Sequence, residues 1–164
     1  RRTRHRRGVG AGAARDRVSV AVRLGAADDL PHVAELYREW GYRSAAHPSD
    51  TLIVAENDHR IVGALRLVVE DGHCVLRGMR VQPAYQRTGV GTRMLELAVK
   101  HIGARECFGI PYEHLLPFYA KLGFVEVPPA DAPPFLAERS ESYRVEGLKV
   151  AIIRRPPRPP LPPR

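Results

Sequence analysis

The chain has 164 residues, which is enough for one domain of ordinary size with its own core. Its formal net charge is +8, a value that on its own would suit a nucleic-acid-binding protein. The excess lies at the ends, because residues 1–17 hold seven arginines and one acid, and residues 154–164 hold four arginines and no acid. Residues 18–153 hold 15 basic and 17 acidic residues. The composition therefore argues against a folded nucleic-acid-binding domain.

The two cysteines and the hydropathy of the chain indicate the cellular compartment to expect. Cys74 and Cys107 stand far apart with no Cys or His at metal-ligand spacing, so neither a disulfide framework nor a metal site is expected. No run approaches the roughly 20 apolar residues of a membrane span, and residues 8–14 are too weakly apolar for a signal-peptide core. We expect a cytoplasmic protein, although the Arg-rich start is also compatible with a transit peptide.

Composition divides the chain into three parts. We expect a disordered basic arm over residues 1–17, a folded domain over 18–154, and a Pro/Arg-rich tail over 155–164. The first part has no apolar periodicity, and six of the fifteen prolines fall in the last nine residues, which is typical of polyproline II. The tail ends in a Pro-x-x-Pro-x-Arg pattern that also suits docking in an aromatic groove.

In the first half of the domain, alternating apolar residues predict strands and residues at helical spacing predict one helix. Asp28 and Asp29 offer an N-cap and Gly41 a stop for that helix. Turn residues join the later strands as hairpins. The expected elements are a strand over 18–23, a helix over 30–40, and antiparallel strands over 51–56, 60–70 and 73–81.

In the second half the apolar period changes to that of an amphipathic helix. The expected elements are a helix over 90–102, a strand over 107–110 parallel to 73–81, a helix over 115–122, a strand over 124–127, a loop over 128–134 and a strand over 148–154. The order predicts a mixed α/β domain: a mostly antiparallel central sheet of about seven strands, with flanking helices and one parallel strand pair.

One loop carries a ligand-binding pattern. Two glycines separated by one residue, Gly89 and Gly91, stand at the start of the 90–102 helix. They remove side chains that would block a ligand, so backbone N–H groups and the positive helix end can meet an anion. Arg87 adds a cation. The segment 86–92 therefore predicts a pyrophosphate site, with an ordinary glycine turn as the alternative.

Two other phosphate-binding motifs are excluded at this loop. A dinucleotide fingerprint needs a third glycine at position 94, which is Met94. A Walker loop needs Gly-Lys-Ser/Thr, whereas Gly91 is followed by Thr92 and Arg93.

Two segments resemble motifs of the GCN5-related N-acetyltransferase (GNAT) family. Residues 79–95 resemble its acetyl-CoA-binding motif, Gln/Arg-x-x-Gly-x-Gly/Ala, and residues 118–124 resemble its second motif of aromatic, Tyr, x, Lys, apolar, Gly, Phe. The resemblance spans residues 18–154. It implies an acyl-CoA N-acyltransferase fold with a splayed parallel strand pair. It also implies transfer of an acetyl group from acetyl-CoA, the acyl donor co-substrate, to a primary amine of an unidentified small molecule or peptide.

The resemblance also assigns roles to individual residues. The backbones of Met79 and Val81 are expected to hydrogen-bond the pantetheine arm and the thioester. Tyr119 is expected to act as the general acid that protonates the leaving thiolate, with a packing role as the alternative. The expected pyrophosphate-binding residues are Gln86, Arg87, Thr88, Gly89, Val90, Gly91 and Thr92.

The acceptor side carries no comparable motif. Many relatives have an Asn seven residues before the Tyr, where this chain has Tyr112. No general base is assigned; Glu70 and His73 stand where relatives place one, with solvated turn residues as the alternative. The resemblance implies that residues 41–50 and 128–147 recognise the acceptor. Four side chains there could hold a cationic amine, or could simply be solvated: His47, Asp131, Glu138 and Glu141.

The expected partners are an amine substrate of small-molecule or peptide type, with no membrane, no metal and no nucleic acid for the folded body. A homodimer is compatible with these expectations. Two alternatives from other classes stay open: a non-catalytic acyl-CoA-binding regulatory domain, and an interaction protein that uses its Arg-rich arms.

Overall fold

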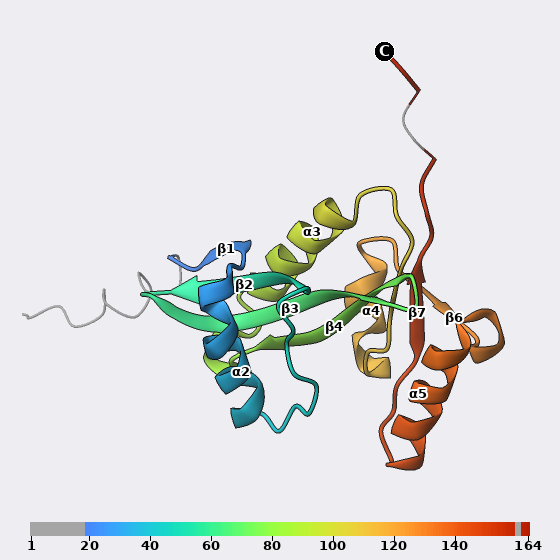
Figure 1. The fold of residues 1–164 in the computed structure, drawn as a ribbon, viewed down its shortest axis with the longest axis horizontal. Helices are drawn as coiled ribbons and strands as arrows, with labels where there is room; N and C mark the ends of the chain where they lie inside the picture. Colours follow the sequence, from blue (N-terminus) through green and yellow to red (C-terminus); the bar gives the residue numbers. More distant parts are fainter. Residues whose placement is uncertain (1–18, 160–161) are drawn as a thin grey trace, which may run out of the picture.

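A computed structural model describes residues 19–159 and 162–164 of the chain. Seven strands form one sheet in the spatial order β1-β2-β3-β4-β5-β7-β6 (Figure 1). The pair β4–β5 is parallel and the other neighbouring pairs are antiparallel, which confirms the predicted fold class. The strands are β1 (Ala21–Leu24), β2 (Thr51–Asn57), β3 (Arg60–Glu70), β4 (His73–Val81), β5 (Cys107–Gly109), β6 (Val125–Val127) and β7 (Ile152–Arg155).

Tight turns join β2, β3 and β4 as the sequence predicts. Both central residues of the first turn have positive φ, 49° at Asp58 and 61° at His59, and so do those of the second, 50° at Asp71 and 76° at Gly72. Positive φ at both positions gives a backbone twist that matches the twist of the flanking strands. The three strands therefore form a continuous antiparallel meander.

Helices cover both faces of the sheet. On one face lie α2 (Leu30–Glu39) and α5 (Pro134–Val145), and on the other lie α3 (Val90–Ile102) and α4 (Leu116–Ala120) (Figure 1). Alternate residues of β2 show the division, because Val54 packs with α2 whereas Ile53 packs with α3. No helix in the described ranges is both long and apolar enough to cross a membrane.

A bulge in β4 opens the centre of the sheet. Arg77 pairs with Arg66 of β3 but Arg80 pairs with Ala64, so β4 contains one extra residue at this point. Gly78 takes a positive φ of 64°, and a Cβ there would overlap the Tyr37 hydroxyl oxygen. That hydroxyl donates to the Gly78 carbonyl at 2.8 Å, so α2 fixes the bulge. β4 and β5 pair only as far as Leu76 and Gly109 and then separate.

The structure corrects several predicted boundaries. Residues 134–145 form α5, where the sequence predicted a loop to 134 and no element beyond it, because few apolar side chains mark this helix: Leu136 and Ser140 are its buried residues. The last strand is Ile152–Arg155 rather than 148–154, and Arg155 is buried. The first strand begins at Ala21; Val18 lies outside the described residues.

Candidate active site

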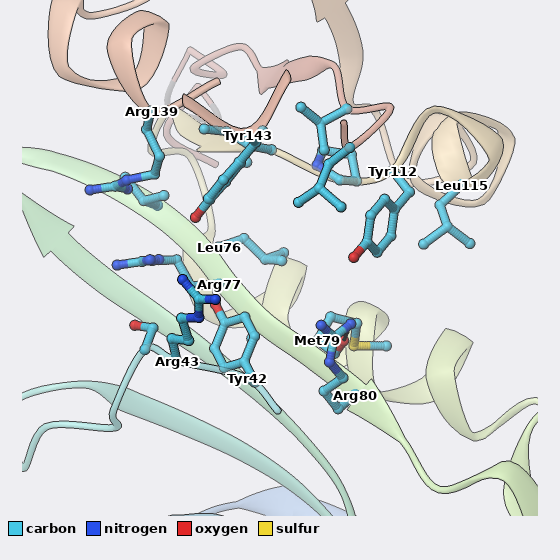
Figure 2. Close-up of a pocket in the computed structure, with 18 of the residues that line it drawn as sticks. Tyr42, Arg43, Leu76, Arg77, Met79, Arg80, Tyr112, Leu115, Arg139 and Tyr143 are labelled. Carbon is cyan, nitrogen blue, oxygen red and sulfur yellow. Dashed lines mark hydrogen bonds between the residues drawn. The ribbon is translucent and has the colours of Figure 1, made fainter. Parts of the chain in front are cut away.

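A cavity of about 610 Å³ occupies the gap between β4 and β5 (Figure 2). It reaches from residues 40–44, which follow α2, past β4 to Tyr119 of α4 on the other side of the sheet. Residues 139–150, from α5 to β7, form the opposite wall. Both segments that the resemblance assigned to acceptor recognition thus line the cavity. It therefore connects the two faces of the sheet through the gap between the strands.

The N-terminus of α3 is an anion site in its geometry. Gly89 is the N-cap with φ 86°, and no side chain caps the first turn. The first backbone N–H groups of the helix are therefore available to an anion, which the helix dipole favours. Arg87 also takes a positive φ, 61°, which turns the chain sharply into the helix. Residues 86–89 are exposed, so a ligand can reach this end.

Packing holds the predicted phosphate loop against the core. Val90 is buried, and a Cβ on Gly91 would lie 3.4 Å from the Met79 methyl group. The Thr88 hydroxyl donates to the Tyr85 carbonyl, and the Gln86 side-chain amide donates to the Val81 carbonyl at 3.0 Å. Thr92 is exposed on the first turn of α3. The loop that enters the helix is therefore fixed in place before any ligand arrives.

The backbone of Met79 and Val81 faces the gap between the strands. The Gln82 N–H donates to the Val62 carbonyl of β3 at 2.8 Å. Because the hydrogen-bonding groups of successive residues point to opposite neighbours, those of Val81 and Met79 point away from β3. The Val81 carbonyl already accepts from Gln86, and an extended ligand in the gap could bond to the remaining groups of these two residues as an added strand would.

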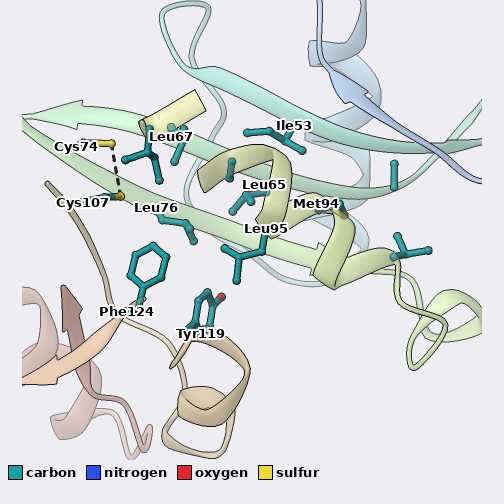
Figure 3. Packing of buried hydrophobic residues seen from close by; sticks show 14 of the residues in the cluster. Ile53, Leu65, Leu67, Cys74, Leu76, Met94, Leu95, Cys107, Tyr119 and Phe124 are labelled. Atoms are coloured by element: carbon teal, nitrogen blue, oxygen red, sulfur yellow. Dashed lines mark hydrogen bonds between the residues drawn. The ribbon is translucent and has the colours of Figure 1, made fainter. Parts of the chain in front are cut away.

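Tyr119 combines a buried ring with a place in the cavity lining. It is 3% exposed, and its ring packs edge-on against Phe118 and also against Phe124, which Figure 3 shows. The residue nonetheless lines the cavity. Burial raises the pKa of the phenol above its usual value, and the positive charge of Arg80 partly opposes that shift. The phenol therefore stays protonated at neutral pH.

Several predicted candidates do not line the cavity. Glu70 accepts from Arg77 at 2.9 Å and from Arg139 at 2.7 Å, and His73 lies against the rings of Phe108 and Phe135. His47 bonds Ser49 and Asp50 within its own loop. These residues and three others are absent from the cavity lining: Glu70, His73, His47, Asp131, Glu138 and Glu141. Tyr112 does line it.

The cavity also contains residues that sequence reasoning missed. Arg139, Tyr143 and Glu146 line it from α5 and its C-cap. Their spacing of four and three residues places them on one helix face, and this repeat is the signal that could have revealed them. The charged lining also includes Arg43, Arg77 and Arg80, and Glu146 supplies its one carboxylate.

A buried ion pair anchors the loop between α2 and β2. Arg66 of β3 binds Asp50 at 2.9 Å, and the two side chains are 2% and 3% exposed. The same guanidinium donates to the Ser44 hydroxyl at 2.9 Å and the Ala45 carbonyl at 3.0 Å. The bonds of Arg66 therefore fix the position of residues 40–44, which form one wall of the cavity.

The two cysteines, distant in the sequence, meet in the core. The sulfur atoms of Cys74 and Cys107 lie 3.5 Å apart as free thiols at the paired end of β4 and β5 (Figure 3). Within residues 19–159 and 162–164, no three His, Cys, Asp or Glu side chains are grouped to hold a metal ion.

The comparisons with known proteins agree with this geometry. Residues 48–126 match the model of the acetyltransferase (GNAT) domain family. N-acetylglutamate synthase from Neisseria gonorrhoeae, complexed with coenzyme A and N-acetylglutamate, superposes with a TM-score of 0.65 at 23% identity. The match covers 85% of this chain and 35% of the synthase, so this chain spans about a third of that protein. No curated protein sequence matches the chain.

Two shorter proteins match along nearly their whole length. An acyl-CoA N-acyltransferase from Pseudomonas aeruginosa has a TM-score of 0.61 at 15% identity, over 84% of this chain and 98% of its own. Naa50 from Arabidopsis thaliana, in complex with the bisubstrate analogue CoA-Ac-MVNAL, has a TM-score of 0.61 at 16% identity, over 83% of this chain and 97% of its own. The family match covers the β4 bulge, the α3 loop and Tyr119. The chain belongs to the GNAT family of acetyltransferases.

Proposed function

We propose that the protein transfers the acetyl group of acetyl-CoA directly to a primary amine. The observation that carries this proposal is the cavity through the sheet, with an anion site and a buried tyrosine on the α3 face and an open pocket on the α2 face. A donor and an acceptor can therefore approach one point from opposite sides. Holding both reactants in one cleft accounts for a large part of a catalysed rate.

On the donor side, the pyrophosphate binds at the N-terminus of α3. The N–H groups of Val90, Gly91 and Thr92 are the unbonded donors there, and Gln86, Arg87, Thr88 and Gly89 shape the approach. The pantetheine arm then extends along β4, where Met79 and Val81 offer backbone groups. Those same groups orient the thioester carbonyl in the gap.

The chemical step uses one proton donor and one proton acceptor. The neutral amine attacks the thioester carbonyl carbon, a C–N bond forms, and the C–S bond breaks. Tyr119 gives its proton to the departing thiolate, and the second proton that the attacking nitrogen must lose restores the Tyr119 phenol, so the products are an amide and CoA with a free thiol. For the proton that the ammonium must first lose, we assign Glu146, the carboxylate in the cavity lining.

The solved relatives support the donor class. N-acetylglutamate synthase and Rv2747 from Mycobacterium tuberculosis were both solved with CoA, and Naa50 with a CoA–acetyl–peptide conjugate. The other groups bound in these structures differ, from N-acetylglutamate to the peptide part of the bisubstrate analogue, so they support a CoA thioester as the donor and leave the acceptor to the pocket of this chain.

The test is a thiol-release assay with acetyl-CoA over a panel of amines, amino acids, polyamines and N-terminal peptides, with mass detection of the acetylated product. We expect release with at least one acceptor class and slow release without an acceptor. Acetyl-CoA binding without transfer to any amine would instead favour the non-catalytic regulatory domain. Propionyl-CoA in a parallel series tests whether acetyl is the preferred acyl group.

A further inference from the structure

The charge of the cavity lining differs from that of the body around it. Four arginines line the cavity against one carboxylate, Glu146. Residues 18–153 as a whole hold slightly more acids than bases. The arginines are therefore a local concentration of positive charge where an acceptor would bind, and they do not reflect a generally basic surface.

Two of these arginines share a single carboxylate. Glu70 accepts from Arg77 and Arg139 through different oxygens, at 2.9 Å and 2.7 Å. The side chains of all three are between 19% and 25% exposed. One negative charge fixes the orientation of two guanidinium groups and leaves the pair with a net positive charge. In Figure 2 this pair lies at the end of the cavity away from Tyr112.

Arg80 has no acidic partner among the described residues. Its guanidinium lies over the Tyr42 ring at 5.1 Å, and its Nη1 makes only a 3.5 Å contact with the Met79 carbonyl. Its Nε is buried without a hydrogen-bond partner. The charge of this guanidinium is therefore not balanced by an acid in the described part of the chain, and an anionic ligand in the cavity would balance it.

These arginines are separate from the predicted phosphate site. Tyr42 packs on Tyr37 of α2 at 4.8 Å, so Arg80 lies on the α2 face of the sheet. The N-terminus of α3 lies on the opposite face. The phosphates of a donor bound at α3 therefore do not account for the charge of Arg80.

We propose that the acceptor is a small amine that carries a carboxylate, as an amino acid does, and that Arg80 binds this carboxylate while the Arg77–Arg139 pair adds to the positive field. This inference rests on the proposed acetyl transfer at the same cavity. A guanidinium fork matches the two oxygens of a carboxylate. In Figure 2 the hydroxyl of Tyr112 points into the cavity on the side of Arg80, where it can donate to the same group, whereas that of Tyr143 lies nearer Arg77 and Arg139. Polyamines, which carry only positive charge, would be repelled.

The test compares acceptors that differ only by one carboxylate. The pairs are L-alanine and ethylamine, L-lysine and cadaverine, and L-phenylalanine and 2-phenylethylamine, each assayed by thiol release with saturating acetyl-CoA. We expect kcat/KM to be at least about 10-fold higher for the carboxylated member of the preferred pair. Equal or better turnover of the amine without a carboxylate overturns the inference, as does a preference for peptides over free amino acids.

Variants locate the effect at Arg80. In Arg80→Gln, KM for the carboxylated acceptor should rise about 10- to 100-fold, because a hydrogen bond to a charged group is lost, while KM for its partner without the carboxylate and the Kd of acetyl-CoA stay unchanged. Arg80→Lys should retain part of the preference. Arg60→Gln, an exposed arginine that does not line this cavity, is the matched control. A purely structural role would affect both members of a pair equally, and loss of acetyl-CoA affinity would place Arg80 in the donor site; either result overturns the inference.

A binding measurement separates this inference from the proposed function. Calorimetric titration of L-alanine and ethylamine into CoA-saturated protein requires no turnover. Tighter binding of L-alanine that Arg80→Gln abolishes supports the carboxylate site even if no amine is acetylated, in which case only the transfer proposal fails. If amines are acetylated with no preference for a carboxylate, the transfer proposal holds and the carboxylate site fails.

Discussion

The donor and acceptor halves of the proposed site are built in different ways. The proposed donor half uses backbone groups from one short stretch, β4 and the loop that enters α3, within residues 79–92. The acceptor half uses side chains from three separate places, residues 40–44, β4 and α5, that lie up to about 100 residues apart in the chain. A site made of backbone groups depends on glycines and a helix start that lie close together in the sequence. A site made of side chains can draw its residues from distant parts of the chain. A substitution in one half should therefore leave binding in the other half unchanged.

The largest expected effect is a loss of turnover when Tyr119, which lies where the two halves meet, is changed. Tyr119→Phe removes one hydroxyl and keeps the buried ring, so kcat should fall by about 10² to 10⁴ while the Kd of acetyl-CoA changes little. Steady-state kinetics and equilibrium titration measure the two quantities. Wild-type kcat in this variant would leave Tyr119 as a packing residue only.

A change beneath the acceptor half should destabilise the protein strongly. Asp50→Ala leaves the Arg66 charge buried without its carboxylate, which should lower the free energy of unfolding by about 3–5 kcal/mol. Acceptor KM should rise and the Kd of acetyl-CoA should not. Asp50→Asn, which keeps an oxygen acceptor, should cost less and permits kinetics if the alanine variant does not fold.

The control for this change is a more exposed pair. Arg154 and Glu106 are 35% and 30% exposed, so Glu106→Ala should cost about 0–1 kcal/mol. Equal losses in the Asp50 and Glu106 variants, measured by chemical denaturation, would mean that the buried pair does not anchor the loop.

In the donor half, the phosphate site should fail without loss of the fold. Gly89 and Gly72 both have positive φ, 86° and 76°, and a Cβ on either meets no atom within 4 Å. An Asp at either position should cost about 1–2 kcal/mol for the left-handed backbone. Gly89→Asp also places a negative charge at the start of α3, so it should weaken acetyl-CoA binding by at least about 100-fold, and Gly72→Asp should not. Similar acetyl-CoA affinities in the two variants would remove the phosphate site from this helix.

A smaller effect appears at alkaline pH. Burial raises the pKa of Tyr37 to about 12, whereas the unfolded chain ionises near the usual value of about 10. The unfolded state therefore holds fewer protons above pH 10, and stability falls by up to about 1.4 kcal/mol per pH unit for this group as pH rises toward 12. Tyr37→Phe should flatten the profile over this window. An unchanged slope in the variant would show that Tyr37 does not titrate as a buried group.

The smallest expected effect concerns the ends. Arg155 is buried and donates to the Leu122 and Gly103 carbonyls, and the Arg158 N–H bonds the Ala104 carbonyl, so the tail can be removed only after residue 158. We propose that deleting residues 1–17 and 159–164 changes the Kd of acetyl-CoA by less than about twofold and removes any salt-dependent nucleic-acid binding. Tight nucleic-acid binding by the trimmed protein would reveal a basic surface on the body.

The proposed donor half can be located from the sequence because its constraints are local. A glycine pair before an amphipathic helix and the hairpin turns at 57–59 and 71–72 are visible within a few residues. The acceptor half was missed because Arg80, Tyr143 and Glu146 look like ordinary surface residues until the fold places them together. α5 itself was missed because its buried side is narrow. Glu70 stands where relatives place a general base, yet its two arginine partners come from β4 and α5, a pairing that only the tertiary structure reveals.

The most direct measurement is a crystal structure of the protein with acetyl-CoA. We predict that the pyrophosphate lies at the backbone N–H groups of Val90 and Gly91. The pantetheine arm should extend along β4 in the gap to β5, and the thioester sulfur should lie within hydrogen-bonding distance of the Tyr119 hydroxyl. Acetyl-CoA bound elsewhere, or with its thioester outside the gap, would contradict the claim that the donor and acceptor halves meet at this point.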